Sequence, residues 1–485
     1  MPAFKKNRLF LALTVTVFFA GCAVGPDYAR PTSTLPEQHK EATTATAQAV
    51  APVNAEWWTL FNDATLNQLV QQTLAANQDL QAAIARLEAS EAAAREAGAE
   101  LYPAIGLAAN GSRNRISGET FSGKNTGSAT YNNRRAALSL SYEVDLWGRI
   151  RRSNEAARAE ALASRFGRDS IQLALIGQLV NEYLILRSNE AQLEVTRQTL
   201  ESRQESLKIV QARLDAGSAS GLELAQAESQ LNAAQGQWSQ FKRLRALSEN
   251  QIGLLSGQPG LKLASTSLEQ LPLPPTPPTG LPSSLLEARP DVRQAEEKLI
   301  AANARIGVAK AAYFPTIGLT GLYGSESAAL SNLFTGSAGI WTAAIGLTMP
   351  IFDAGRTGAR VDQATAAQAE NIANYRKTLQ TAFREVSDAI VNLQEFANEE
   401  AAFAAQVDAS KRAFNLAQKR YESGYSGYND LLDTQRTLNT AQLLYLASRK
   451  NRLGASVDLF KALGGGWQPV RQHLLRSNSK NNPIF

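Results

Sequence analysis

Alternation of apolar and polar residues predicts β-strands in two parts of the chain. From Leu138 to Leu146, leucine, tyrosine and valine alternate with serine, glutamate and aspartate. Between Trp341 and Met349, apolar residues alternate with small or polar ones. A period of two gives each strand one apolar face and one small or polar face. We interpret each of these segments as the return strand of a β-hairpin. We therefore expect two hairpins, at about 104–147 and 315–352, and four strands in all.

Long alanine-rich stretches with a helical period follow each hairpin. They carry weak apolar stripes with polar residues between them, which is typical of a coiled coil. We expect long helices over 149–216 and 355–423, and shorter return helices over 222–256 and 428–463. At about 1.5 Å per residue, the first long helix would measure roughly 100 Å, about three times the hydrocarbon thickness of a bilayer.

Three shorter helices are expected elsewhere in the chain. They run from Leu60 to about Ala76, from Asp79 to Leu101 and from Pro290 to Ala312. The second of them is dense in good helix formers and stops before Tyr102-Pro103, since the residue that precedes a proline disfavours helix. Stacked end to end with the return helices, the second and third would nearly match the length of the long helices.

Matching landmarks recur 207 residues apart and indicate an internal two-fold repeat. Trp147-Gly148-Arg149 precedes the first long helix and Ala354-Gly355-Arg356 the second, while Gly217 and Gly424 end them. A helix reversal needs a residue that tolerates a positive φ, and we assign that role to both glycines. We therefore divide the chain into repeat 1, a proline-rich linker, repeat 2 and a C-terminal tail, at 57–260, 261–283, 284–464 and 465–485.

The N-terminus has the pattern of a secretory signal. Three cations precede an apolar run, Leu9 to Ala20, that is too short to span a membrane as a helix. Ala20-Gly21-Cys22 follows, and small residues before the only cysteine are similar to a bacterial lipobox, in which the thiol is acylated. An ordinary signal peptide with an incidental cysteine is the alternative. We expect a signal peptide at 1–21, a lipidated Cys22 and a lipid-anchored extended linker at 22–56.

Composition argues against several classes of function. The net charge is +5, but the signal segment carries three of those cations, so the remaining chain is nearly balanced and lacks a nucleic-acid footprint. Two histidines and one cysteine supply no metal-ligand cluster. The sequence has no phosphate-binding glycine loop and no nucleophile elbow. We therefore expect neither an enzyme nor a cofactor.

Four strands cannot form a membrane-spanning sheet by themselves. Such a sheet must close to leave no edge, and transmembrane barrels begin at eight strands. Either the sheet is soluble and packs on the helices, or several chains pool their strands. Two chains would give eight strands, with an interior that side chains fill, and three would give twelve, with room for a lumen. We favour three.

Seven segments resemble bacterial outer-membrane efflux channels of the OprM type, in the family that also contains TolC. They are GPDYARP after Cys22, EWWTLFND at 56–63, EVDLWGR at 143–149, LLEARPDVRQAE at 285–296, AAYFPTIGLT at 311–320, LLDTQRTLNTAQ at 431–442 and KALGGGW at 461–467. The resemblance implies a mixed α and β membrane protein. It would be a homotrimer in which a 12-stranded β-barrel in the outer membrane is continuous with a 12-helix periplasmic tunnel. It also implies docking to a periplasmic adaptor (a membrane fusion protein) and an inner-membrane pump.

The resemblance places the family's periplasmic gate at the second helical turn. Three-fold symmetry would gather acidic side chains into rings, which favour cations in a narrow pore, and a nearby arginine would offset their repulsion. The alternative for Asp430 is a helix cap. In the first turn Glu223 and Gln226 occupy the equivalent places, and Ser426 stands where some relatives carry a basic partner. The gate residues that the resemblance implies are Tyr421, Asp430, Asp433 and Arg436.

These features favour a passive conduit in the outer membrane that is lipid-anchored and extends into the periplasm. It would export drugs or other toxic solutes delivered by a tripartite pump of the resistance-nodulation-division class. A wide water-filled duct need not recognise its cargo, so the pump and adaptor would choose the solute. The alternatives are a channel for type I protein or peptide export and a periplasmic coiled-coil adaptor.

Overall fold

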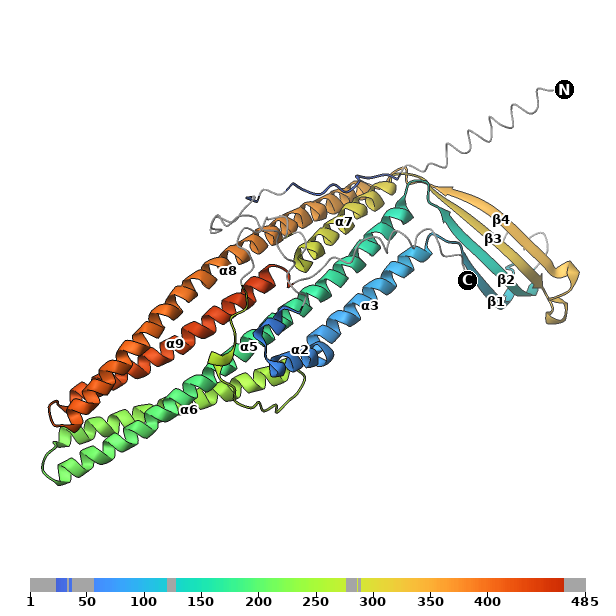
Figure 1. The fold of residues 1–485 in the computed structure, drawn as a ribbon. Helices are drawn as coiled ribbons and strands as arrows, with labels where there is room; N and C mark the ends of the chain where they lie inside the picture. Colours follow the sequence, from blue (N-terminus) through green and yellow to red (C-terminus); the bar gives the residue numbers. More distant parts are fainter. Residues whose placement is uncertain are drawn as a thin grey trace. The chain divides into compact units, whose positions relative to one another are not determined.

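The computed structural model describes residues 23–32, 35–36, 56–119, 128–275, 286 and 289–465. Most of these residues are helical, and one four-stranded sheet is present (Figure 1). The described residues fall into two compact units. Unit 1 takes those within Met1–Thr32, Leu87–Ser164 and Ala295–Tyr375, and unit 2 those within Ser33–Arg86, Arg165–Gln294 and Arg376–Phe485.

The sheet belongs to unit 1 and is antiparallel throughout. Its strands pair in the order β1-β2-β3-β4 (Figure 1). Leu146, expected on the apolar face of the second strand, lies beyond it in a tight turn, where its N–H donates to the carbonyl of Val144. The strands are β1 (Ala104–Arg115), β2 (Thr130–Val144), β3 (Thr316–Ser327) and β4 (Gly339–Thr348).

The register gathers most of the large apolar residues of the four strands on one face, in line with the two-faced pattern read from the sequence. Leu107 pairs with Leu138, Leu138 with Tyr323, and Tyr323 with Trp341. Directly paired residues of an antiparallel sheet project to the same side. Trp341 is 76% exposed and Ile345 72% exposed, so the apolar face is open in the single chain. The opposite face carries mainly serine, threonine, glycine and alanine, with Glu143 and Glu326, and it also holds Leu322 and Ile340.

The sheet has two free edges in the single chain. Within the described residues, β1 pairs only with β2, and β4 pairs only with β3. Each outer strand therefore presents a row of backbone N–H and C=O groups without a strand partner.

Residues 23–32 belong to unit 1 and are held there by specific contacts. The N–H of Val24 donates to the carbonyl of Trp147 at 2.9 Å, and Arg30 makes two hydrogen bonds to the carboxylate of Glu296, at 2.7 and 2.9 Å. A Cβ on Gly25 would lie 2.5 Å from the Cα of Gly307, so this close approach requires glycine. The segment that directly follows Cys22 is thus fixed next to the junction between β2 and the first long helix.

The long helices and return helices stay within two residues of their expected bounds. Part of every long helix lies in each unit. None of the described helices is both long enough and apolar enough to cross a membrane. The helices are α2 (Ala64–Ala76), α3 (Gln78–Ala99), α5 (Arg149–Asp215), α6 (Gly221–Leu255), α7 (Pro290–Ala311), α8 (Arg356–Glu422) and α9 (Tyr428–Ala462).

The start of α2 corrects the sequence prediction of a helix from Leu60. A 3-10 helix, η1 (Trp57–Phe61), comes first, and Asn62 adopts a left-handed conformation with φ of 50° that ends it. Asp63 then caps α2, accepting a hydrogen bond from the N–H of Leu66 at 3.0 Å. A short polar residue with positive φ followed by a capping aspartate interrupts what otherwise reads as one helix.

The hydrophobic core of unit 2 lies where η1 and α2 meet α5, α6 and α9. Trp57 is fully buried and stacks on Phe460, with ring centroids 5.5 Å apart. Beside this core, α5 holds a buried ion network. Arg187 donates to Glu190 at 2.7 Å and to the Tyr183 hydroxyl at 2.9 Å, and Arg245 donates to the same glutamate at 3.1 Å. Burial opposes the charge of Arg187, but the hydrogen bond to Glu190 leaves the pKa of Arg187 above its ordinary value.

This network predicts that two arginines on α5 contribute very differently to the free energy of unfolding. Arg187 is 1% exposed and pairs with Glu190, whereas Arg197 is 47% exposed and pairs with Glu194 at the same spacing. Arg187→Ala should lower the free energy of unfolding by roughly 3–5 kcal/mol, because it leaves a buried carboxylate short of its partner. Arg197→Ala should change stability little, since water screens its ion pair. Thermal unfolding followed by circular dichroism measures both variants, and equal losses would contradict a stabilising role for the buried pair.

Candidate functional site

The two turns that end α5 and α8 share one backbone geometry. Ser218 N–H donates to the carbonyl of Arg213 at 2.8 Å, and Gly217 N–H donates to that of Leu214 at 2.9 Å. The second turn repeats both bonds, 207 residues later, at 2.8 and 3.1 Å. These are the paired bonds of a Schellman motif, which needs a left-handed residue at its glycine. Gly217 and Gly424 have φ of 73° and 76°, and nothing lies within 4 Å of a Cβ built on either. Their backbone conformation therefore accounts for both glycines.

Tyr421 lies inside a small hydrophobic cluster at these turns. It is 7% exposed and contacts the ring of Tyr428, with centroids 5.7 Å apart. The guanidinium of Arg213, on α5, lies 4.3 Å from the centroid of the Tyr421 ring. Burial raises the pKa of the Tyr421 phenol above its ordinary value. Tyr421 therefore joins the end of α8 to the end of α5 and the start of α9.

Asp430 and Asp433 both lie on the exposed side of the first turns of α9. The residue that caps this helix is Gly427, without a side-chain hydrogen bond, and Asp430 is the third residue of the helix. The alternative interpretation of Asp430 as the helix cap is therefore wrong. Among the described residues, no side chain pairs with either carboxylate.

The first turn uses its acidic residue differently. Ser220 caps α6 by accepting a hydrogen bond from the N–H of Glu223 at 3.3 Å, and the Glu223 carboxylate accepts one from the N–H of Ser220 at 3.1 Å. This reciprocal pair is a capping box. Because Gly427 replaces the serine in the second turn, the carboxylate of Asp430 is not engaged in the same way. The turns are thus asymmetric in structure as well as in sequence.

Arg436 does not pair with the aspartates within one chain, contrary to the expectation that it offsets their charge. It lines a cavity of about 380 Å³ together with Arg203 of α5, and glutamine, asparagine and threonine side chains surround them. Arg203 is buried and donates to the side-chain oxygen of Gln435. Burial lowers the pKa of Arg203, and repulsion from Arg436 acts in the same direction. Sequence reasoning missed Arg203 because it lies more than 200 positions from Arg436.

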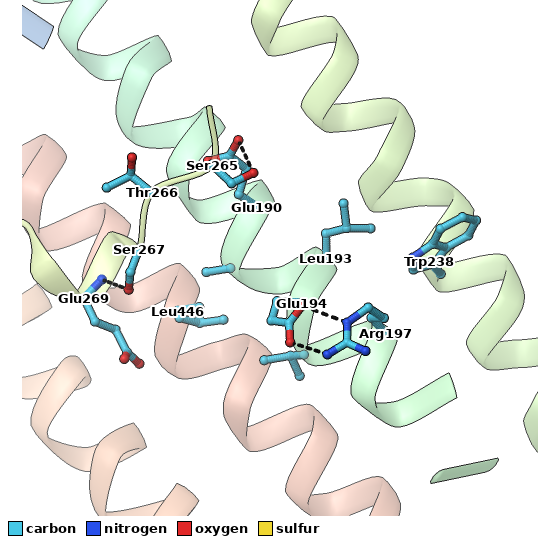
Figure 2. Close-up of a pocket in the computed structure, with 12 residues that line it drawn as sticks. Glu190, Leu193, Glu194, Arg197, Trp238, Ser265, Thr266, Ser267, Glu269 and Leu446 are labelled. Atoms are coloured by element: carbon cyan, nitrogen blue, oxygen red, sulfur yellow. Dashed lines mark hydrogen bonds and ion pairs between the residues drawn. The ribbon is translucent and has the colours of Figure 1, made fainter. Parts of the chain in front are cut away.

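A second cavity of about 570 Å³ lies in unit 2 between α5, α6 and the segment 265–269 (Figure 2). Three of its charged groups have partners: Arg197 donates to Glu194 at 2.7 and 2.9 Å, and Glu190 accepts from the Ser265 hydroxyl at 3.2 Å. The hydrogen bonds from Arg197 lower the pKa of Glu194 to about 2, so this carboxylate stays ionised. The arrangement contains ion pairs and an apolar wall.

Metal binding finds no support in the described residues, where no three His, Cys, Asp or Glu side chains form a ligand set. Two other sequence predictions bear on the site. Ser426, at the second turn, has a buried hydroxyl for which no partner is found in the part of the chain that the structure describes. Cys22, the predicted lipidation site, lies outside the described residues.

Comparison with known proteins finds a matching family and relatives that are all outer membrane proteins. The family model for outer membrane efflux proteins matches residues 69–258 and 281–465. The chain is 36% identical to the toluene efflux pump outer membrane protein TtgC of Pseudomonas putida over 474 residues, which is 95% of this chain and 96% of that protein. It is 35% identical to the outer membrane protein OprJ of Pseudomonas aeruginosa over 484 residues, 99% of each chain.

Solved structures show the same fold over nearly the whole chain. The Campylobacter jejuni outer membrane channel CmeC superposes with a TM-score of 0.85 at 26% identity, covering 96% of this chain and 99% of that one. The open state of the Neisseria gonorrhoeae outer membrane channel MtrE gives a TM-score of 0.82 at 30% identity, covering 92% and 98%. With two turns that reverse long helices, a two-faced sheet and these matches, the chain belongs to the outer membrane efflux protein family.

Proposed function

We propose that this chain is the outer-membrane channel of a tripartite efflux pump of the resistance-nodulation-division class. The observation that carries the proposal is the family match over most of the chain, in a molecule whose sheet has one apolar and one polar face. Relatives named for toluene, solvent and antibiotic efflux support small toxic organic solutes as the cargo. A periplasmic adaptor and an inner-membrane pump would deliver these solutes, and the chain would conduct them passively without catalysis.

The free edges of the sheet support a homotrimer. Inside a bilayer every backbone polar group needs a partner, so β1 and β4 cannot remain unpaired there. Pairing β1 of one copy with β4 of the next satisfies both edges, and three copies give twelve strands with room for a lumen. The helices of the three copies would then line the periplasmic part of the duct.

The two faces of the sheet support an assignment of lipid and lumen sides. We place the face of Leu138, Leu140 and Trp341 against lipid, because its side chains are apolar and exposed. The face of Ser139, Ser141 and Glu143 then lines the lumen. Alternation of apolar and polar residues along each strand is the usual pattern of transmembrane strands.

The exposed carboxylates of α9 support a gate at the second turn. Three-fold symmetry would bring Asp430 and Asp433 of three copies around one axis, where rings of carboxylates favour cations. Tyr421 would hold the turn through its contacts with Tyr428 and Arg213. Arg436 makes no ion pair with these aspartates in its own chain, so a neighbouring copy is the source of any charge compensation.

Lipidation of Cys22 would add a second anchor to the membrane. Residues 23–32 are fixed within unit 1, where the N–H of Val24 donates to the carbonyl of Trp147 shortly after β2. A lipid on Cys22 would therefore emerge close to the end of the sheet that joins the helices. One acyl signal gives only modest membrane binding, and the strands would supply the rest.

The function is tested by removing the gene from its native host and measuring the accumulation of a fluorescent antibiotic and tolerance to toluene. We expect higher accumulation and lower tolerance, and both should return when the gene is restored. Unchanged accumulation together with a lost secreted protein would contradict efflux and favour type I protein export.

The assignment of the sheet faces predicts different effects of arginine at adjacent positions. Leu140→Arg should cost roughly 2–4 kcal/mol, because it places a charge on the lipid side. Ser139→Arg should be far milder, since that side chain faces the lumen. The yield of heat-resistant oligomer after refolding into liposomes reports both changes, and similar losses at the two positions would reverse or refute the assignment.

The gate predicts a change in conduction when its carboxylates are removed. The double variant Asp430→Ala, Asp433→Ala should have higher single-channel conductance in planar bilayers, and its reversal potential in a salt gradient should move toward zero as cation preference weakens. Glu223→Ala is the matched control, because Glu223 serves a capping box, and its conductance should stay close to wild type. A double variant that matches wild type in both measurements would place the gate elsewhere.

The lipid anchor predicts covalent labelling at one residue. Cells fed a radioactive fatty acid should label the wild-type chain, while Cys22→Ser should carry no label because the only thiol is gone. Insertion of the variant should persist in part through the strands. Equal labelling of both chains would exclude Cys22 as the modified residue.

A further inference from the structure

The apolar face of the sheet ends in three arginines. Moving from Leu138 toward the hairpin between β1 and β2, the residues on this face of β2 are Ala136, Arg134 and Asn132. Their partners on β1 are Ala109, Gly111 and Arg113, and Arg115 follows on the same face. The side chain of Arg134 lies over Gly111, where a Cβ would sit 3.9 Å from the Cγ of that arginine. The face therefore changes from leucine through alanine and glycine to arginine.

These arginines are the only charged residues on this face of the four strands. Arg134 donates to the carbonyl of Ala328 at 2.6 Å, and Arg115 donates to the Ser128 hydroxyl at 3.4 Å. Neither acceptor carries a charge, and among the described residues none of the three guanidinium groups pairs with a carboxylate. The opposite face differs, because there Arg135 lies 3.8 Å from the carboxylate of Glu326, which also accepts a hydrogen bond from Asn133.

The position of the arginines along the strands fits the rim of a bilayer. Arg134 is four residues beyond Leu138, or about 13 Å at the rise of a β-strand. The paired rings of Tyr323 and Trp341 lie on the leucine row, and such aromatic residues gather at the edges of a membrane. On a lipid-facing surface, arginine is costly at mid-depth and nearly neutral at the interface.

The hairpin end of the sheet is opposite to the end that continues into the helices. The ends joined to helices are Ala104, Val144, Thr316 and Thr348, whereas the three arginines flank the β1–β2 hairpin. In the proposed function the helices extend into the periplasm, so the arginines would lie at the external leaflet. A guanidinium group binds phosphate through two parallel hydrogen bonds, and guanidinium groups whose protein acceptors carry no charge would favour that partner at a lipid headgroup.

We propose that Arg113, Arg115 and Arg134 form a binding site for the phosphate groups of a phosphorylated glycolipid in the external leaflet. The inference rests on the proposed function, because it needs this face to contact lipid. Acyl chains would lie on the leucine, tyrosine and tryptophan side chains. The small side chains of Ala109 and Ala136 would let the headgroup approach the sheet next to the arginines.

Lipid retention by the purified full-length protein tests the site. The wild-type protein is placed in nanodiscs of zwitterionic lipid, and a glycolipid with two phosphates on its sugar headgroup is titrated in. The same titration uses that glycolipid after its phosphates are removed, and native mass spectrometry counts the bound lipids. We expect the wild-type protein to bind the phosphorylated form and to discriminate strongly against the dephosphorylated one. Inorganic phosphate at the same phosphate concentration should not displace the lipid, because it lacks acyl chains.

The variants assign the binding to named side chains. Removing a basic side chain from an anionic lipid surface should weaken binding about fivefold, so Arg113→Gln, Arg115→Gln and Arg134→Gln together should weaken it on the order of 100-fold. Arg135→Gln is the control, since this neighbour lies on the opposite face, and its affinity should stay within about twofold of wild type.

Equal binding by the triple variant, equal binding of the dephosphorylated lipid, or displacement by inorganic phosphate would each overturn the site. Conductance in planar bilayers separates this result from the proposed function. A wild-type protein that conducts but does not select the phosphorylated lipid refutes the site alone. A wild-type protein that neither inserts nor conducts refutes the proposed function.

Discussion

The unsatisfied backbone at the outer edges of β1 and β4 is the constraint on which the proposed assembly depends. A lone four-stranded sheet in lipid would expose rows of N–H and C=O groups, each costing several kcal/mol. The same sheet buries little of its apolar face within one chain, where Trp341 stays 76% exposed. Pairing copies edge to edge in a bilayer would satisfy the backbone groups and would cover the apolar face with lipid. In the proposed function, assembly and membrane insertion would therefore both follow from the need to pair these edges.

The long helices are under a different constraint. In the proposed function they extend far beyond the bilayer, so they must fold without a continuous apolar surface. In unit 2, a compact core around Trp57 and a buried network around Arg187 stabilise long helices whose other faces stay polar. At the turns, Gly217 and Gly424 reverse the chain with the same Schellman bonds, but the helices that follow begin differently. Ser220 uses Glu223 to cap α6, and Gly427 makes no such use of Asp430. This difference of one capping residue leaves the Asp430 carboxylate without the backbone partner that Glu223 has.

Local sequence patterns predicted the helices and strands well, but they could not predict contacts between residues far apart in the chain. Alternation from Leu138 to Val144 defined a strand with two faces, and Gly217 and Gly424 marked both helix reversals. Asn62 and Asp63 were misread, because a positive φ at asparagine is set by its surroundings. The presence of Arg203 and Arg436 in the lining of one cavity could not be predicted from spacing, since it depends on how α5 and α9 pack. Likewise, the shared face of Arg113 and Arg134 followed only from the pairing register of β1 with β2.

Disulfide cross-linking between the two free edges tests the central claim most directly. Ala108→Cys on β1 is combined, one at a time, with cysteine at Thr342, Ala344 or Gly346 on β4, positions that project to the same face. If β1 of one copy pairs with β4 of the next, oxidation in membranes should give covalent species of two and three chains and none larger for at least one pair. Monomers alone for every pair, or a ladder that continues beyond three chains, would contradict closure by three copies.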